Sequence, residues 1–424
     1  MNQANEALLE ESMPTTQSPR RILLLMSDTG GGHRAAATAI QAALENRYPG
    51  AYTFDMVDAF RYYTPTPFKH MPRLYPLWVN HARSSWGTGY RISDGPHRSK
   101  LVMGSFYVSW RRGFRRLFDE HPADLVVCVH SLFNHNAMRV LQDWPTRPRF
   151  VTVVTDLVST HAFWYNNKVD LCLVPTQTAY ERGLRYKMQP EKMKITGLPV
   201  HPDFVAGLTD KQQAREELGW DVKKLTVLLV SGGDAMGPLF KTARAINDQK
   251  LDIQLVIIAG RNAPLKAKLE GCDWNQTTHI YPFTEKMAQM MSGADILVTK
   301  AGPATISEAF VAGIPMILSG HVPGQEDGNV RYVIESGAGV YAPGPTRVAE
   351  VLAEWVSRPP DFRQRYADAA KQIGSTDAAS QIADEIHGVA QAAQIVVHHP
   401  RRSPRSLLSH RLRPNIARPR GGAL

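Results

Sequence analysis

Residues able to bind an anion and a sugar are concentrated in one stretch, which runs from 298 to 331 and reads VTKAGPATISEAFVAGIPMILSGHVPGQEDGNVR. Small residues and a proline at 301–305 predict a tight turn and the first turn of a helix. A helix start presents unpaired backbone N–H groups and a partial positive charge, and one favourable contact with an anion is worth about 0.3–1 kcal/mol. The stretch therefore predicts a binding site for a diphosphate.

Further hydrogen-bonding groups follow this helix start. Glu308 falls one turn into the expected helix, three residues after Thr305. A carboxylate there can accept hydrogen bonds from two neighbouring hydroxyls, as on a ribose. The strand expected at 314–318 opens into the glycine-rich loop 320–329, which is dense in groups that bind sugar hydroxyls. These features favour a ligand in which a sugar is linked to a nucleoside diphosphate.

Several motifs in a fixed order carry a resemblance to a known family. They are ILLLMSDTGGGHRAAATAI from residue 22, VVTDLVSTHAFWY from 153, GLPVHPDF from 197, SGGDAMGP from 231, and KAGPATISEA with its GQEDGN loop from 300. Over residues 22 to about 340 the chain resembles glycosyltransferase family 28, and specifically the monogalactosyldiacylglycerol (MGDG) synthases. The resemblance implies the GT-B fold, in which two Rossmann-like domains face a central cleft.

The resemblance also implies a reaction. It is the transfer of galactose from UDP-galactose to the free hydroxyl of 1,2-diacylglycerol, with inversion, to give β-linked MGDG and UDP. We expect no cofactor, since the UDP-sugar is a substrate, and no metal, since no Asp-x-Asp pair occurs in the sequence to hold a divalent ion. Helix N-termini and glycine-loop amides would then stabilise the charge on the departing UDP.

The donor side of the expected site is drawn from the second half of the chain. Amides and a hydroxyl at 231–233 would bind the diphosphate, and Gln325 and Glu326 would hold the hexose. Phe283 would lie against the uracil, and Arg261 would either frame the uracil or assist the phosphates. The complete expected donor set is Ser231, Gly232, Gly233, Arg261, Phe283, Lys300, Gly302, Pro303, Ala304, Thr305, Glu308, Gln325, Glu326 and Asn329.

The acceptor hydroxyl is a poor nucleophile and needs a base. His33 follows the glycines Gly31 and Gly32 at an expected helix start, and an imidazole with a pKa of about 6.5 is suited to take the hydroxyl proton. The alternative is that His33 only caps the helix or binds a phosphate. Asp156 and His161 follow a strand whose carboxyl end borders the crevice in such folds, so either is an alternative base, and Asp156 could orient His33.

Strand-like apolar runs alternate with helical patterns, which predicts an α/β fold with parallel sheets covered by helices. In the first half the expected strands are 22–26, 52–57, 125–129, 150–154 and 171–175; in the second half they are 225–230, 254–259, 278–281, 296–299 and 315–318. The expected domains are 21–197, with an insertion at about 61–118, and 198–390. Disordered tails are expected at 1–20 and 391–424.

Basic residues are unevenly distributed. Seven arginines and no acid between 397 and 424 supply most of the formal net charge of +10. The insertion at 61–118 interleaves aromatic and basic residues, which suits a helical surface facing an anionic membrane. The alternatives are a solvated tail and an insertion whose aromatics fill the core. Nucleic acid is not an expected partner, because no recognition motif accompanies the arginines.

The remaining features indicate an intracellular enzyme at a membrane surface. Cys128, Cys172 and Cys272 form no paired framework, which favours a reducing compartment and buried thiols. Apolar runs fall far short of the ~18 residues of a spanning helix, and the N-terminus lacks a signal pattern. We therefore expect a cytoplasmic protein bound peripherally to the cytoplasmic face of the membrane.

Other functions fit parts of the sequence. Within transferases, the alternatives are a UDP-glucose-dependent diacylglycerol glucosyltransferase and an N-acetylglucosaminyltransferase acting on a lipid-linked precursor. A UDP-sugar epimerase would share the double-Rossmann fold. The loop at 27–35 formally contains GxGxxA, and Asp55 ends the next strand, as in an NAD-binding domain. A non-enzymatic lipid- or nucleotide-binding protein is the last alternative.

Overall fold

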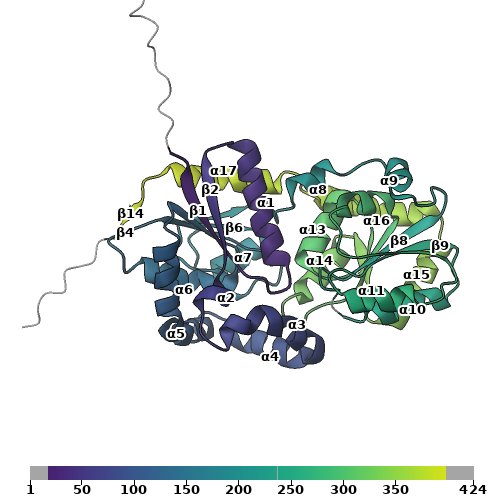
Figure 1. Ribbon diagram of the computed structural model, residues 1–424, viewed down its shortest axis with the longest axis horizontal. Helices are drawn as coiled ribbons and strands as arrows, with labels where there is room; N and C mark the ends of the chain where they lie inside the picture. The colour runs from purple at the N-terminus through teal and green to yellow at the C-terminus, as the bar shows by residue number, and fades with distance from the viewer. Residues whose placement is uncertain (1–17, 236, 398–424) are drawn as a thin grey trace, which may run out of the picture.

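Two parallel sheets of six strands each form the centre of two lobes (Figure 1). The computed structural model describes residues 18–235 and 237–397. The strand order is β2-β1-β3-β5-β6-β7 in the first sheet and β10-β9-β8-β11-β12-β13 in the second. Two Rossmann-like α/β lobes facing each other make the GT-B arrangement that the resemblance implies.

The first lobe contains β1 (Arg20–Met26), α1 (Gly32–Arg47), β2 (Tyr52–Asp58), α2 (Ala59–Tyr63), α3 (Met71–His81), α4 (Arg83–Ser93), α5 (Arg98–Glu120), β3 (Leu125–Cys128), α6 (Ser131–Leu141), β4 (Thr146–Arg147), β5 (Arg149–Val153), β6 (Leu171–Val174), α7 (Gln177–Arg185) and β7 (Met193–Ile195). The rest of the chain contains α8 (Pro202–Ala206), α9 (Lys211–Leu218), β8 (Leu225–Val230), α10 (Leu239–Asp248), β9 (Ile253–Ile258), α11 (Ala263–Glu270), β10 (Thr277–Tyr281), α12 (Met287–Gly293), β11 (Ile296–Lys300), α13 (Pro303–Ala312), β12 (Met316–Gly320), α14 (Asp327–Glu335), β13 (Gly339–Tyr341), α15 (Pro345–Ser357), α16 (Pro360–Ile373), α17 (Ala378–Gln391) and β14 (Ile395–Val396).

All ten strands expected from the sequence are present, within one or two residues at their ends. Each sheet also has a sixth strand, β7 and β13, which the sequence analysis missed. Both are only three residues long and lie at a sheet edge, where few apolar residues are needed. The central strands are buried on both faces. In β1, for example, Leu23 and Leu25 pack in one apolar cluster while Ile22 and Leu24 pack in the cluster on the opposite face.

The insertion is helical, as expected, and its aromatic residues divide between two environments. On α5, Tyr107, Trp110 and Phe114 are buried in the core of the first lobe, so the core-filling alternative is correct for these three. The opposite face of α5 exposes Leu101 and Val108, at 77% and 83% of their surface. Within the described ranges, no helix is both long and apolar enough to cross a bilayer.

The chain returns to the first lobe near its end. Helix α17, yellow in Figure 1, lies on α1, and its buried residues, such as Ile382 and Ile386, complete one face of the first sheet. In sequence this helix falls in the range expected for the second domain. Gly197, where the chain leaves the first lobe, lies against Ala378, where it comes back, so the two crossings touch.

A short segment near the C-terminus extends the ordered structure beyond the expected limit. Residues 395 and 396 fall within the expected C-terminal tail, but they form β14, which pairs antiparallel with β4. The arginines at 401–420 and residues 1–17 lie outside the described residues. Cys128 and Cys172 are buried, as expected, whereas Cys272 is only partly buried; all three are free.

Replacing Ile382 tests whether α17 is part of the first lobe's core. Ile382→Ala removes a fully buried side chain and leaves a cavity, so we expect the free energy of unfolding of the first lobe to fall by about 2–5 kcal/mol. Urea unfolding followed by tryptophan fluorescence measures this loss. The control is Gln381→Ala on the exposed face of the same helix, with an expected change within about 0.5 kcal/mol. Equal effects of the two substitutions would contradict this packing.

Candidate active site

The carboxyl ends of the strands in both sheets meet at one seam. In such sheets, ligands bind outside the carboxyl ends of the strands. Hydrogen bonds join the lobes here, and two of them link these ends directly: Gln325 Nε2 donates to Asp156 Oδ1 at 3.3 Å, and Gly328 N donates to Ser159 Oγ at 2.7 Å. The loops that follow β5 and β12 therefore face each other, and the residues predicted from the two halves of the sequence lie at a common site.

His33 lies in the first turn of α1, at the end of the glycine loop. Its Nδ1 lies 2.8 Å from the carbonyl oxygen of Val129 and 3.0 Å from Thr155 Oγ1. A carbonyl can only accept, so Nδ1 carries the hydrogen and Nε2 keeps the lone pair of a base. Burial lowers the pKa of His33 to about 4, which keeps the ring neutral at physiological pH. The ring is thus oriented by Val129 and Thr155, whereas the oxygens of Asp156, which could have oriented it, are bonded to Trp164 and Gln325.

A second histidine, His130, lies beside His33. The two ring centroids are 4.4 Å apart. His130 Nδ1 accepts from the backbone N–H of Leu132, which leaves Nε2 to face Thr29 Oγ1 at 3.4 Å. Burial lowers the pKa of His130 well below its usual value, and the adjacent His33 lowers it further. The pair therefore holds two neutral imidazoles beneath the glycine loop.

Asp156 is a buried carboxyl in the middle of the seam. Its Oδ2 accepts from the indole of Trp164 at 2.7 Å, and its Oδ1 accepts from Gln325. Burial raises the pKa of Asp156 to about 6, although both hydrogen bonds oppose the shift. A carboxyl with a pKa close to neutrality can exchange a proton with a reacting group, so Asp156 remains an acid–base candidate.

The amino end of α13 is open to an anion. Its N-cap is Gly302, which has no side chain to cap the first backbone N–H groups, and Pro303 is the first helical residue. A Cβ on Gly302 would lie 2.8 Å from Lys300 Nζ, so the ammonium group lies directly beside the helix start. The positive charge of the Lys300 ammonium therefore lies next to the partial positive charge at the amino end of α13. Thr305 lies in the first turn of the helix.

Lys300 is held in place by a buried ion pair. Its Nζ lies 2.8 Å from Glu326 Oε1, and the other carboxylate oxygen of Glu326 accepts from the backbone N–H of Val322 at 2.7 Å. Both oxygens of Glu326 are engaged within the protein. Asn329 is also buried and donates to the carbonyl of Ala301, which braces the turn before α13 from below.

Glu308 lies one turn further along α13, where the sequence analysis expects a contact with ribose hydroxyls. Burial raises the pKa of its carboxyl to about 7, and burial is the sole cause of the shift. A carboxyl in this state gains stabilisation from any hydroxyl that donates to it. Glu308 thus has the properties expected of a residue whose hydrogen-bond partner is a ligand.

The loop after β8 continues the site towards the expected uracil position. A Cβ on Gly233 would lie 2.8 Å from Arg261 Nη1, and one on Gly232 would lie 3.8 Å from Lys300 Cε. The Arg261 guanidinium lies over the Phe283 ring, 4.2 Å from its centroid. The ring is 48% exposed and can stack on a planar base. Ser231 begins this loop.

His161 has a structural role. It is almost fully buried; its Nδ1 accepts from the backbone N–H of Phe163, and its Nε2 lies 3.2 Å from both Ser93 Oγ and the carbonyl of Tyr90. Nε2 therefore contacts the end of α4, while Nδ1 caps the turn at 162–164. Gly31 and Gly32 open α1 beside His33, as expected.

Sequence analysis missed three residues of this site: His130, Tyr75 and Tyr90. His130 follows the end of β3, so the rule that pointed to Asp156 could have found it. Tyr75 and Tyr90 belong to the aromatic insertion and contact the donor loop: the Tyr75 hydroxyl bonds to Gln325, and the Tyr90 ring lies against Gly324. The sequence alone does not distinguish these two from the aromatics in the core.

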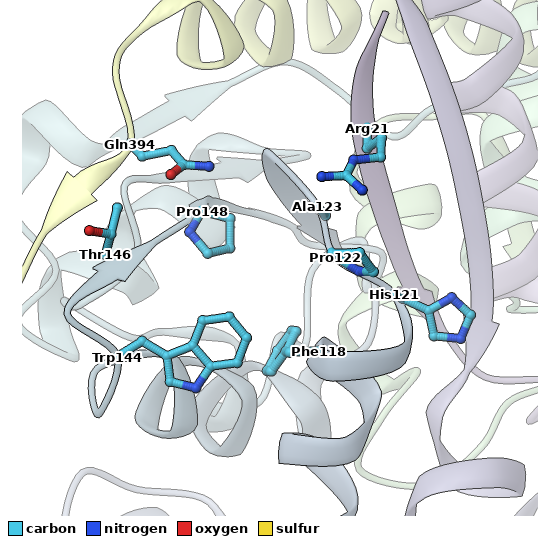
Figure 2. A pocket seen from close by; sticks show the side chains of 9 residues that line it. All are labelled: Arg21, Phe118, His121, Pro122, Ala123, Trp144, Thr146, Pro148 and Gln394. Atoms are coloured by element: carbon cyan, nitrogen blue, oxygen red, sulfur yellow. The ribbon is translucent and has the colours of Figure 1, made fainter.

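A separate cavity of about 190 Å³ opens at the opposite end of the first sheet (Figure 2). Arg21, Ala123 and Pro148, from the amino ends of β1, β3 and β5, line it together with Trp144. None of the residues predicted for the site lines this cavity, so it is distinct from the seam.

Comparisons with known proteins agree with this geometry. Residues 33–200 match the family model of monogalactosyldiacylglycerol (MGDG) synthase, and residues 227–386 match the glycosyltransferase family 28 C-terminal domain. The chain is 36% identical over 383 residues to the chloroplastic MGDG synthase of Spinacia oleracea, covering 87% of this chain and 72% of the spinach protein. It is 34% identical over 403 residues to MGDG synthase 1 of Arabidopsis thaliana, covering 91% and 75%.

Solved structures show the same fold at low identity. MurG of Acinetobacter baumannii superposes with a TM-score of 0.56 at 14% identity, covering 87% of this chain and all of MurG. MnaA of S. aureus, solved with UDP, gives 0.56 at 12% identity, covering 87% and 96%. The fold and the seam define a glycosyltransferase of the GT-B class. Within that class, the chain belongs to the MGDG synthase family.

The raised pKa of Asp156 predicts how its substitution changes stability. The pKa of Asp156 is about 6 in the folded protein and about 3.9 in the unfolded chain. Protonated Asp156 therefore contributes to folding stability below pH 4, and this contribution is lost as the pH rises through 6. Asp156→Asn places an NH2 against one of the two donors, Trp164 or Gln325, at any pH, but it should be more favourable at pH 8 than at pH 4 by on the order of 1–2 kcal/mol. Urea unfolding at the two pH values measures the difference.

Asp28→Asn provides the control of opposite sign. The hydrogen bond from Arg34 lowers the pKa of Asp28, so its ionised form stabilises the native state above the unfolded pKa. This variant should lose stability at pH 8 and recover it as the pH falls. An Asp156→Asn substitution that is no more favourable at pH 8 than at pH 4 would contradict the raised pKa of Asp156.

Proposed function

We propose that the protein transfers galactose from UDP-galactose to the free hydroxyl of 1,2-diacylglycerol, with inversion, to give β-linked MGDG and UDP. The observation that carries this proposal is the similarity to MGDG synthases along both lobes, up to 36% identity over 87% of the chain. The seam supports it, because the open terminus of α13, Lys300 and Glu308 form a site for a nucleoside diphosphate.

The reaction is a single displacement. The acceptor oxygen attacks the anomeric carbon on the face opposite the nucleotide, through an oxocarbenium-like transition state. His33 Nε2 takes the hydroxyl proton, because Val129 and Thr155 fix its tautomer. Charge develops on the departing UDP, and the N–H groups of α13, the glycine-loop amides and Lys300 stabilise it without a metal ion.

The acceptor reaches the seam from a membrane surface that binds the first lobe. Exposed apolar side chains are frequent on the helices of the insertion: Leu77 and Trp78 on α3, Ile92 on α4, and Leu101 and Val108 on α5. The exposed bases Lys69, Arg73 and Lys100 accompany them. A basic residue close to an anionic bilayer contributes about 1 kcal/mol, so this surface favours peripheral binding to the membrane.

A product assay tests the proposed function. Purified protein is incubated with vesicles containing anionic lipid and diacylglycerol, and with radiolabelled UDP-galactose or UDP-glucose. We expect β-galactosyl diacylglycerol as the main product, with EDTA causing less than about a twofold loss because the seam stabilises UDP with its own groups. A glucolipid product would assign the alternative donor, and activity lost with EDTA and restored by magnesium would contradict the metal-free mechanism.

Substituting His33 tests the base. His33→Ala should reduce kcat by at least about 100-fold, the usual contribution of general base catalysis, and leave the Kd for UDP within about threefold. Single-turnover kinetics and calorimetry measure the two quantities. The matched control is His97→Ala, an exposed histidine before α5, which should behave as wild type. Wild-type turnover in a His33→Ala enzyme would exclude His33 as the base.

A further inference from the structure

Tyr75 reaches from the insertion into the seam. It is on α3, and its ring lies 3.3 Å from where a Cβ on Gly30 would sit, so it packs directly on the glycine loop before His33. Its hydroxyl donates a hydrogen bond to Gln325 Oε1 at 3.3 Å. One side chain of the first lobe thus touches both the loop that presents the base and the loop expected to hold the hexose.

The side-chain amide of Gln325 is held in one orientation by two bonds of opposite polarity. Its Nε2 donates to Asp156 Oδ1, and its Oε1 accepts from the Tyr75 hydroxyl. An amide can rotate so that its oxygen and nitrogen exchange places, and the two ends differ only in their hydrogen-bonding capacity. Both partners that oppose this exchange belong to the first lobe.

The backbone of the same loop is held independently of Tyr75. Gly87 on α4 packs so closely on Pro323 that a Cβ on Gly87 would lie 2.8 Å from the Pro323 Cβ, and the Tyr90 ring lies 3.1 Å from where a Cβ on Gly324 would sit. Gly328 N is bonded to Ser159 Oγ. Loss of the Tyr75 hydroxyl would therefore remove one of the two bonds that fix the Gln325 amide and make its rotation easier, while the loop stays in place.

We propose that Tyr75 is a positioning residue that selects the hexose: it fixes which end of the Gln325 amide faces the hydroxyls of the donor sugar. The proposal rests on the function proposed above, in which Gln325 contacts the hexose. Hexoses such as galactose and glucose differ in the direction of one hydroxyl, so a fixed donor and a fixed acceptor atom can distinguish them. An amide free to rotate satisfies either sugar and discriminates less.

The test is Tyr75→Phe, which keeps the ring on Gly30 and removes only the hydroxyl. We expect kcat/KM for the preferred UDP-hexose to fall about three- to tenfold, as for the loss of one neutral hydrogen bond, and the preference over the epimeric UDP-hexose to fall by a similar factor. The Kd for UDP, which lacks the hexose, should stay within twofold. The control is Tyr62→Phe, since Tyr62 is 56% exposed and its substitution should change neither quantity.

A double variant distinguishes positioning from packing. If Tyr75 acts through Gln325, adding Tyr75→Phe to Gln325→Ala should cause no further loss of kcat/KM or of hexose preference. Unchanged hexose preference in Tyr75→Phe, or a full additive loss in the double variant, would overturn the proposal. If the proposed function fails, the wild-type protein will form no galactolipid, which distinguishes that outcome from failure of the Tyr75 proposal. If the protein transfers another hexose, the preference of wild type and Tyr75→Phe is compared between that sugar and its epimer.

Discussion

Exclusion of water from the seam between the lobes is the constraint on which the site depends. The same desolvation raises the pKa of Asp156 and Glu308 and lowers that of His33. Near pH 7 His33 is thereby neutral, Glu308 is close to half protonated, and Asp156 is mostly ionised but can take up a proton more readily than a carboxyl in water. In water both carboxyls would be fully ionised at this pH.

This arrangement lowers the stability of the unliganded protein. Partial burial of Glu308 disfavours its charged form, a cost that a donating ligand would offset, whereas Glu326 is compensated by Lys300 and the Val322 amide. The two carboxyls, one on α13 and one at the start of α14, thus differ in how far the protein itself compensates them. Ligand binding then recovers free energy that folding alone does not provide.

The sequence predicted the elements and site residues that a local pattern along the chain encodes. Most of the ten expected strands, such as β1, β3 and β8, were found because they are short apolar runs, and the residues around α13 were found because a helix start, a carboxylate and a glycine-rich loop follow one another. The three-residue strands β7 and β13 are too short to give a pattern. Tyr75 and the packing of α17 depend on contacts between distant parts of the chain, about 250 residues apart for Tyr75 and Gln325. No local pattern encodes such contacts.

The contact between Gly197 and Ala378 determines how the lobes can move. The polypeptide passes between the lobes at two adjacent points. The line through these two points can therefore serve as a hinge axis. Twisting one lobe about the long axis would pull these crossings apart, while swinging it about the line through them leaves both intact. Rotation about this line brings the same two faces back into register each time the lobes close.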